Sequence, residues 1–109
     1  MVIFLQVLVF LCCISLTSLA QAQTCRASWY HMGTKTANGE HYNPDGLTLA
    51  HRTYPFGTKL KVTYHGRSVI ARVNDRGPFV SGRCADLSRG TAHVVHLKGV
   101  QIVQLEKVN

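Results

Sequence analysis

The chain has few acidic residues and lacks a serine-nucleophile motif, repeats and a dense basic run. Each of these features argues against a class of protein. Only five of its 109 residues are Asp or Glu against twelve Lys and Arg, so the formal net charge is +7. The basic residues are scattered without a dense run, which argues against a nucleic-acid interface. No Gly-x-Ser-x-Gly motif is present, so nucleophilic hydrolysis by a serine is not indicated. The chain also lacks repeats and low-complexity tracts, which is typical of one small domain.

Charge is absent from the first part of the chain. Residues 2–20 carry no Asp, Glu, Lys or Arg and are mostly apolar, and Ala20-Gln21-Ala22 follows them. This pattern predicts a secretory signal peptide at residues 1–22, although no Lys or Arg precedes the apolar run. Cleavage after Ala20 is the close alternative, and an uncleaved anchor is the minority one. We therefore expect an exported domain at residues 23–109, in the periplasm or outside the cell, as a monomer without stable membrane insertion.

Two of the four cysteines, Cys25 and Cys84, remain after the predicted cleavage. An even number of cysteines in an exported domain favours a disulfide. Closing a loop of that length would stabilise the fold by roughly 4 kcal/mol in the chain-entropy model. Two unpaired thiols are the alternative, because sequence does not give their distance.

Short stretches with strand character recur along the chain. In residues 59–64 and 67–73, apolar and polar residues alternate as in strands with one buried face. His65-Gly66 between them has the length of a hairpin loop. Further strands are expected at residues 26–30 and 100–108, a short extended segment at 84–86 and a short helix at 89–95, while residues 47–50 form a short apolar run before His51. Ser88 can cap that helix. Many short strands with one short helix favour an all-β barrel or sandwich.

The stretch Asn74-Asp75-Arg76-Gly77-Pro78-Phe79 ends the 67–73 strand. Proline fixes its own φ and cannot donate a ladder hydrogen bond, so the chain must turn here. The turn holds the carboxylate of Asp75 and the guanidinium of Arg76 at the end of a strand, which suits an acid that must be placed accurately. In the simpler interpretation, Asp75 only caps the turn.

Four side chains are candidates for acid–base chemistry: Glu40, His51, Asp75 and Asp86. Cleavage of a glycosidic bond needs an acid that protonates the leaving oxygen and a base. Glu40 and Asp75 could supply this pair if the fold brings them together. The residues alone leave plainer roles open, namely a solvent-facing loop acid for Glu40, a structural histidine for His51 and a helix-dipole partner for Asp86.

Metal binding has little support in the sequence. His93 and His96 are three residues apart and could share a helix face. No carboxylate or cysteine accompanies them at ligand spacing, so we predict neither a metal nor a cofactor.

Several blocks of the chain appear in an order that resembles the rare lipoprotein A family of septal lytic transglycosylases. The blocks are Ala27-Ser28-Trp29-Tyr30, Thr36-Ala37-Asn38-Gly39-Glu40, Leu47-Thr48-Leu49-Ala50-His51-Arg52-Thr53, Pro55-Phe56-Gly57-Thr58, Asn74-Asp75-Arg76-Gly77-Pro78-Phe79 and Asp86-Leu87-Ser88. The resemblance implies a six-stranded double-psi β-barrel that cleaves peptidoglycan glycan strands, preferably those without stem peptides. The cysteine pair is not part of the general family pattern.

The resemblance also implies roles for individual residues. Glu40 and Asp75 fall on the family's catalytic acids and His51 on its supporting histidine. Asp86 falls where the related plant expansins and family 45 endoglucanases carry a key aspartate, and we place it among the substrate-binding residues. The remaining predicted contacts to substrate are Arg52, Arg76, Arg83, Tyr30 and Phe79.

Two other functions fit the same sequence. One is a non-catalytic module that binds or loosens wall glycan as expansins do. The other is a secreted effector whose family chemistry has been lost, although unneeded buried acids would cost stability. For the enzyme, the basic surface would attract the lactyl carboxylates of peptide-free strands, and Arg matches a carboxylate with its planar fork.

Overall fold

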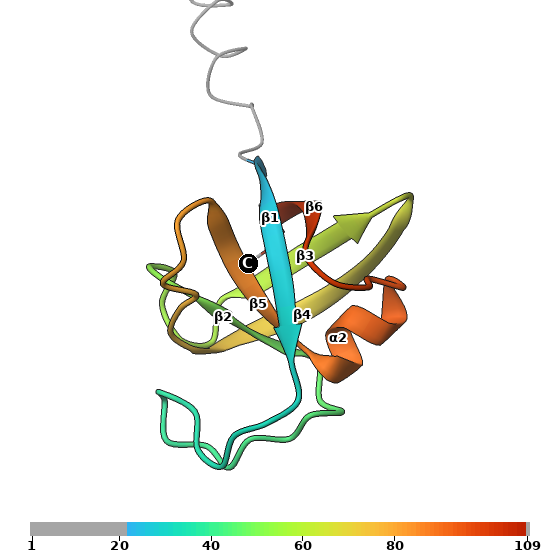
Figure 1. The fold of residues 1–109 in the computed structure, drawn as a ribbon. Helices are drawn as coiled ribbons and strands as arrows, with labels where there is room; N and C mark the ends of the chain where they lie inside the picture. The colour runs from blue at the N-terminus through green and yellow to red at the C-terminus, as the bar shows by residue number, and fades with distance from the viewer. Residues whose placement is uncertain (1–21, 109) are drawn as a thin grey trace, which may run out of the picture.

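A computed structural model describes residues 22–108, and the predicted signal peptide lies outside the described residues except for Ala22. Figure 1 shows six strands and one helix. In chain order these are β1 (Ala22–Tyr30), β2 (Thr48–His51), β3 (Lys59–Tyr64), β4 (Arg67–Asp75), β5 (Arg83–Ser88), α2 (Arg89–Val94) and β6 (Gln101–Lys107).

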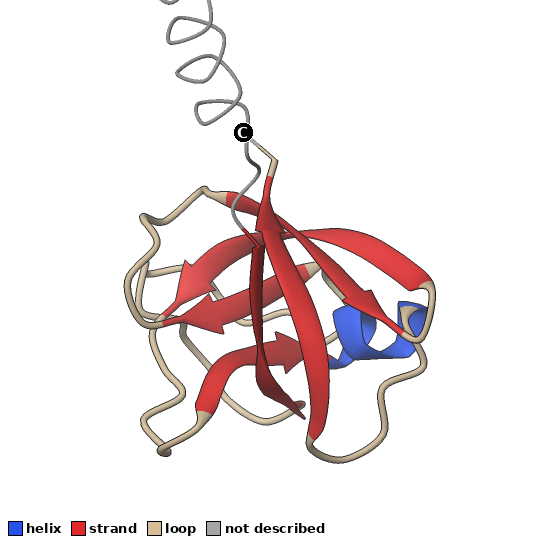
Figure 2. Ribbon diagram, turned by 90° about the horizontal axis from the view of Figure 1, so that it is seen from above, coloured by secondary structure: helices blue, strands red, loops and turns tan. Residues whose placement is uncertain are grey.

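The strands close into a barrel in the order β1-β5-β2-β4-β3-β6. The pairs β1–β5 and β2–β4 are parallel, and the other four pairs are antiparallel. Figure 2 shows the curved sheet from above, with the helix at one side. The predicted all-β class, a six-stranded barrel with one short helix, is confirmed.

The alternating pattern in the sequence decides which side chains fill the barrel. In β3 the side chains of Leu60 and Val62 are buried while Lys59 and Lys61 are exposed. In β4 the residues Val69, Ala71 and Val73 face the core. Leu49, Leu87, Val103 and Leu105 from the other strands complete its centre. Each strand therefore has one apolar face toward the interior.

A tight hairpin joins β3 to β4, as predicted. Tyr64 pairs with Arg67 across a two-residue loop, and both loop residues have positive φ, 47° at His65 and 78° at Gly66. This is the backbone that a type I′ turn requires, and its twist matches that of the flanking strands.

Two β-bulges interrupt the ladders. In the β2–β4 pair, Leu49 lies opposite Val73 but Ala50 lies opposite Asp75, so Asn74 is an extra residue in β4. In the β1–β5 pair the register likewise skips Cys84. A bulge reverses which face the following residues occupy. Val73 faces the core, so without the bulge Asp75 would face it too.

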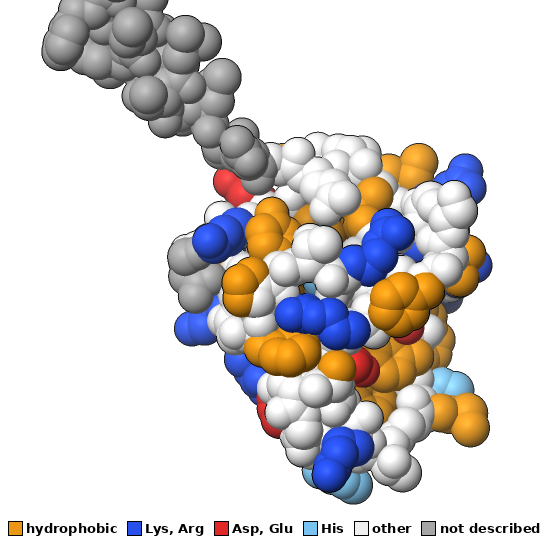
Figure 3. Space-filling model, turned by 90° about the vertical axis from the view of Figure 1, so that its left-hand side faces the viewer, with side chains coloured by type: hydrophobic (Ala, Val, Ile, Leu, Met, Phe, Trp, Pro, Cys, Tyr) orange, Lys and Arg blue, Asp and Glu red, His pale blue; other side chains and the backbone are white. Residues whose placement is uncertain are grey.

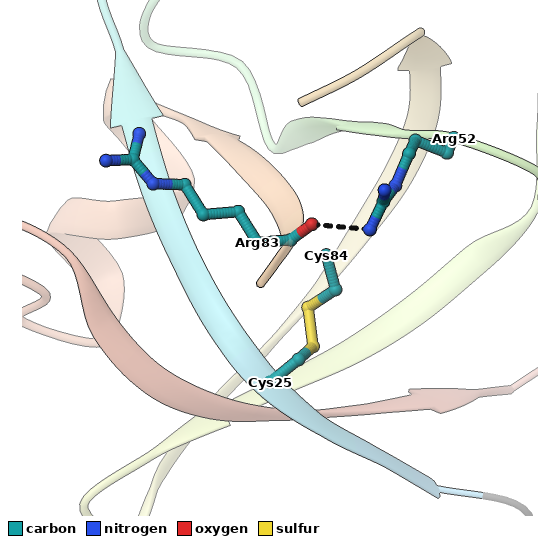
Figure 4. The surroundings of a disulfide bond; sticks show 4 residues. All are labelled: Cys25, Arg52, Arg83 and Cys84. Atoms are coloured by element: carbon teal, nitrogen blue, oxygen red, sulfur yellow. Dashed lines mark hydrogen bonds between the residues drawn. A yellow bond between two sulfur atoms is a disulfide. The ribbon is translucent and has the colours of Figure 1, made fainter. Parts of the chain in front are cut away.

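A disulfide joins Cys25 on β1 to Cys84 at the second bulge, with the Cα atoms 5.8 Å apart. Figure 4 shows the bond between these neighbouring strands. The predicted pairing is confirmed, and it ties the start of the described chain to its second half.

The helix α2 begins where the sequence predicted and ends at Val94, one residue earlier than predicted. The Ser88 Oγ accepts a hydrogen bond from the Thr91 N–H at 3.1 Å, which caps the helix. The same hydroxyl donates to the Gly46 carbonyl oxygen at 2.6 Å. The helix start is thereby fixed to the loop that precedes β2.

Candidate active site

The strand register aligns four residues across one face of the barrel. Ser28 on β1 pairs with Asp86 on β5, Asp86 pairs with Ala50 on β2, and Ala50 pairs with Asp75 on β4. Directly opposed residues in neighbouring strands project to the same face of a sheet. The two aspartates therefore flank the small side chain of Ala50 on the outer face. We call these four residues the acidic row.

The carboxylate of Asp75 is held by three donors. The Tyr30 hydroxyl donates to Oδ2 at 3.1 Å, and the backbone N–H groups of Ala37 and Arg76 each donate to Oδ1 at 2.9 Å. Both oxygens of Asp75 are thus oriented by groups from three separate segments. This fixed orientation is what accurate proton transfer requires.

Tyr30 is itself positioned by Tyr42. The two rings stack with centroids 4.6 Å apart, and the Tyr42 hydroxyl donates to the Tyr30 carbonyl oxygen at 2.7 Å. Burial, followed by the charge of Asp75, raises the pKa of the Tyr30 hydroxyl well above its usual range. Tyr30 therefore stays protonated and donates its hydrogen bond to Asp75 across the working pH range.

Asp86 has a different environment from Asp75. Burial raises the pKa of its carboxyl group, and the charge of Asp75 adds to the effect. A hydrogen bond from the Ser28 hydroxyl at 3.0 Å and the charge of Arg83 oppose the rise. Asp86 thus holds a proton more readily than an ordinary aspartate does.

Glu40 lies in an ion pair. Its two carboxylate oxygens accept hydrogen bonds from the two Nη atoms of Arg72, and the Asn38 amide donates to Oε1 at 2.7 Å. The bonds from Arg72 and then from Asn38 lower the pKa of Glu40 to about 2. Glu40 is therefore an anion at any pH at which the domain would work.

The loop that carries Glu40 also contacts the end of β4. The Ala37 N–H bonds to Asp75, and the Asn38 N–H donates to the Asn74 carbonyl oxygen at 3.2 Å. The predicted partners Glu40 and Asp75 are thus linked through a single loop, residues 36–40. They lie at the same end of β4, although their environments differ.

His51 does not join the acidic row. It lies opposite Ala85, a fully buried core residue, so its side chain faces the interior and is only 6% exposed. The Nδ1 atom accepts hydrogen bonds from the backbone N–H groups of Thr53 and Tyr54, both at 3.2 Å. Burial lowers the pKa of the imidazole, and Arg52 and Arg76 lower it further. A neutral His51 therefore shapes the turn after β2.

Two of the three predicted substrate arginines bind the protein's own backbone. Arg76 donates from Nη1 to the carbonyl oxygens of His51 and Tyr54 at 3.1 and 2.8 Å, and its guanidinium lies 4.0 Å from the centroid of the Phe56 ring. Arg52 donates from Nη2 to the Arg83 carbonyl oxygen at 2.7 Å, as Figure 4 shows. The guanidinium of Arg83 points away from this contact.

Two aromatic residues were predicted to contact substrate, Tyr30 and Phe79. Tyr30 is half-buried and touches the row through its hydrogen bond to Asp75. Phe79 follows the Gly77–Pro78 turn and is 81% exposed. On the face drawn in Figure 3, acidic side chains lie between hydrophobic and basic ones. An exposed aromatic ring can stack on a sugar.

Sequence reasoning missed the residues that support the acids. Arg72 is one of the outward residues of an alternating strand, and this pattern does not indicate its partner. Asn38 and Tyr42 stand in a polar loop and gave no separate signal. Asn74 carries the bulge that turns Asp75 outward, and a β-bulge has no reliable mark in a single sequence.

Other classes of site were sought in the described part of the chain. Within residues 22–108, no three His, Cys, Asp or Glu side chains gather as a metal site. No helix in the same range is long and apolar enough to cross a membrane.

Comparisons with known proteins agree with the barrel and its motifs. A family model described as "Lytic transglycolase" matches residues 22–106. The chain is 53% identical over 89 residues to a probable endolytic peptidoglycan transglycosylase RlpA of Synechocystis, covering 75% of this chain and 28% of that protein. It is 49% identical over 89 residues to the endolytic peptidoglycan transglycosylase RlpA of Campylobacter jejuni, covering 75% and 32%. The matched region is therefore less than a third of each relative's length.

A solved structure shares the fold. The Streptomyces papain inhibitor superposes with a TM-score of 0.68 over 84% of this chain and 98% of that one, at 21% identity. At this identity the likeness concerns the barrel alone.

Proposed function

The chain belongs to the lytic transglycolase family, and from that premise we propose that it cleaves the glycan strands of peptidoglycan. The products would end in anhydromuramic acid, and strands without stem peptides would be preferred. The observation that carries the proposal is the acidic row, which presents two carboxyl groups with unlike surroundings on one face. Such pairs divide the work of acid and base.

In the proposed reaction Asp86 donates its proton to the glycosidic oxygen that follows N-acetylmuramic acid, and the bond from that oxygen to the anomeric carbon breaks. The 6-hydroxyl of the same sugar then attacks the anomeric carbon and closes the anhydro ring. Asp75 accepts the hydroxyl proton. The leaving sugar has gained one proton and the hydroxyl has lost one, so exchange with solvent restores both carboxyl groups.

This division of roles refines the expected Glu40–Asp75 pair. Glu40 remains in the proposed site as an anion paired with Arg72, and we assign it the role of holding the 36–40 loop, whose Ala37 N–H binds Asp75, against β4. It does not donate the proton, because its pKa lies at about 2. His51 is proposed as a positioning residue, because its carbonyl oxygen holds Arg76 and its imidazole holds the following turn.

Substrate contacts are proposed for the aromatic and basic side chains near the row. Phe79 and Tyr30 would stack on sugar rings. Arg52 and Arg76 would act through the backbone segments that they hold. Arg83 and Asp86 would contact the strand directly.

The setting of the reaction is part of the proposal. Residues 1–22 would direct export and residues 23–109 would act as a monomer at the wall, in the periplasm or outside the cell. The relatives of Synechocystis and Campylobacter jejuni are named as peptidoglycan transglycosylases, which supports a peptidoglycan substrate. The net charge of +7 suits polyanionic wall material.

The test is to incubate the purified protein with peptide-free glycan strands in ¹⁸O-labelled water. Mass spectrometry of the products then shows whether they contain the label. Ring closure by the 6-hydroxyl predicts anhydro ends without label. Labelled reducing ends would mean hydrolysis and would overturn the proposal. Binding without any product would leave the expansin-like module as the function.

Isosteric variants connect this activity to the row. Asp75→Asn and Asp86→Asn are each expected to lower the rate by about a hundredfold to ten-thousandfold, the usual contribution of a positioned acid or base. Asp45→Asn is the matched control, because Asp45 pairs with Arg89 outside the row. If all three variants cleaved glycan at the same rate, the two aspartates of the acidic row would have no part in catalysis.

A further inference from the structure

We propose that Arg26 and Arg83 form an anion-binding subsite that holds the lactyl carboxylate of a second muramic acid, which is separated by one N-acetylglucosamine from the one whose bond is cut. The inference rests on the proposed function and assigns a site beyond it. The two arginines line a cleft of about 460 Å³. The rest of its lining consists of Val80, Ser81, Val100, Gln101 and Ile102.

The strand register places the two cations side by side. Arg26 on β1 lies directly opposite Arg83 on β5, and on its other side it lies opposite Ile102 on β6. Like charges in directly opposed positions destabilise a sheet. An anion between the two guanidinium groups would remove this repulsion.

Neither guanidinium forms a hydrogen bond or an ion pair with another described residue. Among the described residues, Arg72 pairs with Glu40, Arg89 pairs with Asp45, and Arg52 and Arg76 donate to backbone carbonyl oxygens. Within residues 22–108 the guanidinium groups of Arg26 and Arg83 have no hydrogen-bond or ion-pair partner. Figure 4 shows the Arg83 side chain extending from β5 away from the disulfide and from Arg52.

The lining of the cleft indicates which anion fits. The cleft has an apolar wall beside the guanidinium groups of the two arginines. It is formed by Val80, Val100 and Ile102, each of which is at least 40% exposed. The lactyl ether of muramic acid carries a methyl group next to its carboxylate. A guanidinium fork matches the carboxylate and the apolar wall matches the methyl group. A bare inorganic anion would use only the first of these features.

The cleft lies beside the acidic row. Arg26 precedes Ser28 by two residues on β1, about 7 Å along the strand and on the same outer face. The charge of Arg83 also acts on the carboxyl group of Asp86. A strand that places one glycosidic bond at Asp86 would therefore extend toward Arg26 and Arg83, where the next muramic acid, one disaccharide further on, could present its lactyl carboxylate.

The experiment measures binding separately from cleavage. In an Asp86→Asn background, calorimetry would compare peptide-free strand fragments with the same fragments after amidation of their lactyl carboxylates. The double change Arg26→Gln with Arg83→Gln should weaken binding of the carboxylate form by about tenfold or more, because hydrogen bonds to charged groups are the strong ones. Arg67→Gln is the matched control, because it removes one charge at the β3–β4 hairpin, away from the cleft.

Several outcomes separate the possibilities. The inference holds if the double change affects the carboxylate fragments and leaves the affinity for the amidated fragments unchanged. It fails if the double variant binds carboxylate fragments as the Arg67→Gln control does. It also fails if fragments bearing stem peptides show the loss and peptide-free ones do not, since the anion would then belong to the peptide.

Failure of this inference can be told apart from failure of the proposed function. If the unmodified protein yields anhydro ends while the double change leaves binding intact, only the subsite is wrong. If the unmodified protein binds no strand, both are wrong. Thermal unfolding of the free double variant gives a second readout. Its midpoint should be equal or higher, because the change removes a repulsion between neighbouring strands.

Discussion

Asp86 and Asp75 are two residues of the same type with different surroundings. Three donors from separate segments fix the carboxylate of Asp75, whereas burial keeps the carboxyl group of Asp86 closer to its protonated form. Between them in the strand register stands Ala50, which is only 3% exposed.

Asp86→Asn is expected to stabilise the protein while it removes activity. Burial raises the folded pKa of Asp86 above its ordinary value of 3.8, so its contribution to stability is complete below that pH and is lost as the pH rises through the folded pKa. Ionising the buried side chain as the pH rises is therefore a cost that asparagine avoids. Thermal unfolding should give a higher midpoint for the variant at neutral pH.

That gain should vanish at a pH of about 3, where Asp86 is already protonated. Asp45→Asn serves as the control at both pH values, because Asp45 is an exposed carboxylate. A lower midpoint for Asp86→Asn than for the unmodified protein at neutral pH would contradict the claim that burial raises the pKa of Asp86.

Glu40→Gln should have the opposite pH signature. The folded pKa of about 2 lies below the ordinary value of 4.5, so the Glu40–Arg72 pair contributes stability above pH 4.5 that is lost as the pH falls toward 2. The side chains are partly exposed, so the loss in the variant at neutral pH should be no more than about 1 kcal/mol. Urea unfolding as a function of pH measures it.

Glu106→Gln on β6 is the matched control for this experiment, because it removes a carboxylate that is not part of the Glu40–Arg72 ion pair. If Glu40→Gln and Glu106→Gln had the same stability profile between pH 4.5 and about 2, Glu40 would not be held by Arg72 as the structure has it.

At the scale of elements, the helix α2 packs so closely against the loop before β2 that a single added methyl group at Gly90 would collide with the loop. Gly90 donates its N–H to the Pro44 carbonyl oxygen at 2.7 Å, and a Cβ added at Gly90 would lie 2.5 Å from the Asp45 carbonyl oxygen. Gly90→Ala should therefore destabilise the protein by about 2 kcal/mol, although alanine is the better helix former. Chemical denaturation measures the change.

His93→Ala on the exposed side of the same helix is the control, and it should change the free energy of unfolding by less than about 0.5 kcal/mol. A stabilised Gly90→Ala variant would mean that helix propensity dominates and that the loop can move away.

Most elements could be predicted from the sequence because their signals are local. Alternation marked β3 and β4, Ser88 marked the helix start, and His65-Gly66 marked the hairpin. The Asn74 bulge left no such signal, and it decides that Asp75 faces outward. Continuing the alternation of Val69, Ala71 and Val73 would have placed Asp75 in the core. The predicted turn is also later than expected, because β4 continues to Asp75.

At the scale of the whole molecule, the disulfide joins residues separated by 59 positions. In the chain-entropy model a loop of that length contributes about 4 kcal/mol. Replacing both Cys25 and Cys84 by alanine should lower the free energy of unfolding by about that amount, which denaturation under oxidising conditions measures. Adding a reductant should destabilise the unmodified protein and leave the stability of the double alanine variant unchanged. Equal stability with and without reductant would contradict the predicted contribution.

The site was only partly predictable because it is assembled from distant segments. The motifs predicted Glu40, Asp75 and Asp86 as site residues, which stays a prediction, but they did not indicate that Arg72, 32 positions away, would bind Glu40. The motif containing His51 likewise did not indicate that its side chain faces the core. These facts depend on barrel closure and register, which follow from the whole chain.

The central claim is that barrel closure places Asp86, a carboxyl group with a raised pKa, on the outer face beside the carboxyl group of Asp75. An NMR titration of the aspartate carboxyl groups tests it most directly. The structure predicts that Asp86 titrates above its ordinary value of 3.8 and that Asp75→Asn lowers that pKa, since the charge of Asp75 helps to raise it. An Asp86 that titrates at or below 3.8 and does not respond to Asp75→Asn would contradict the account.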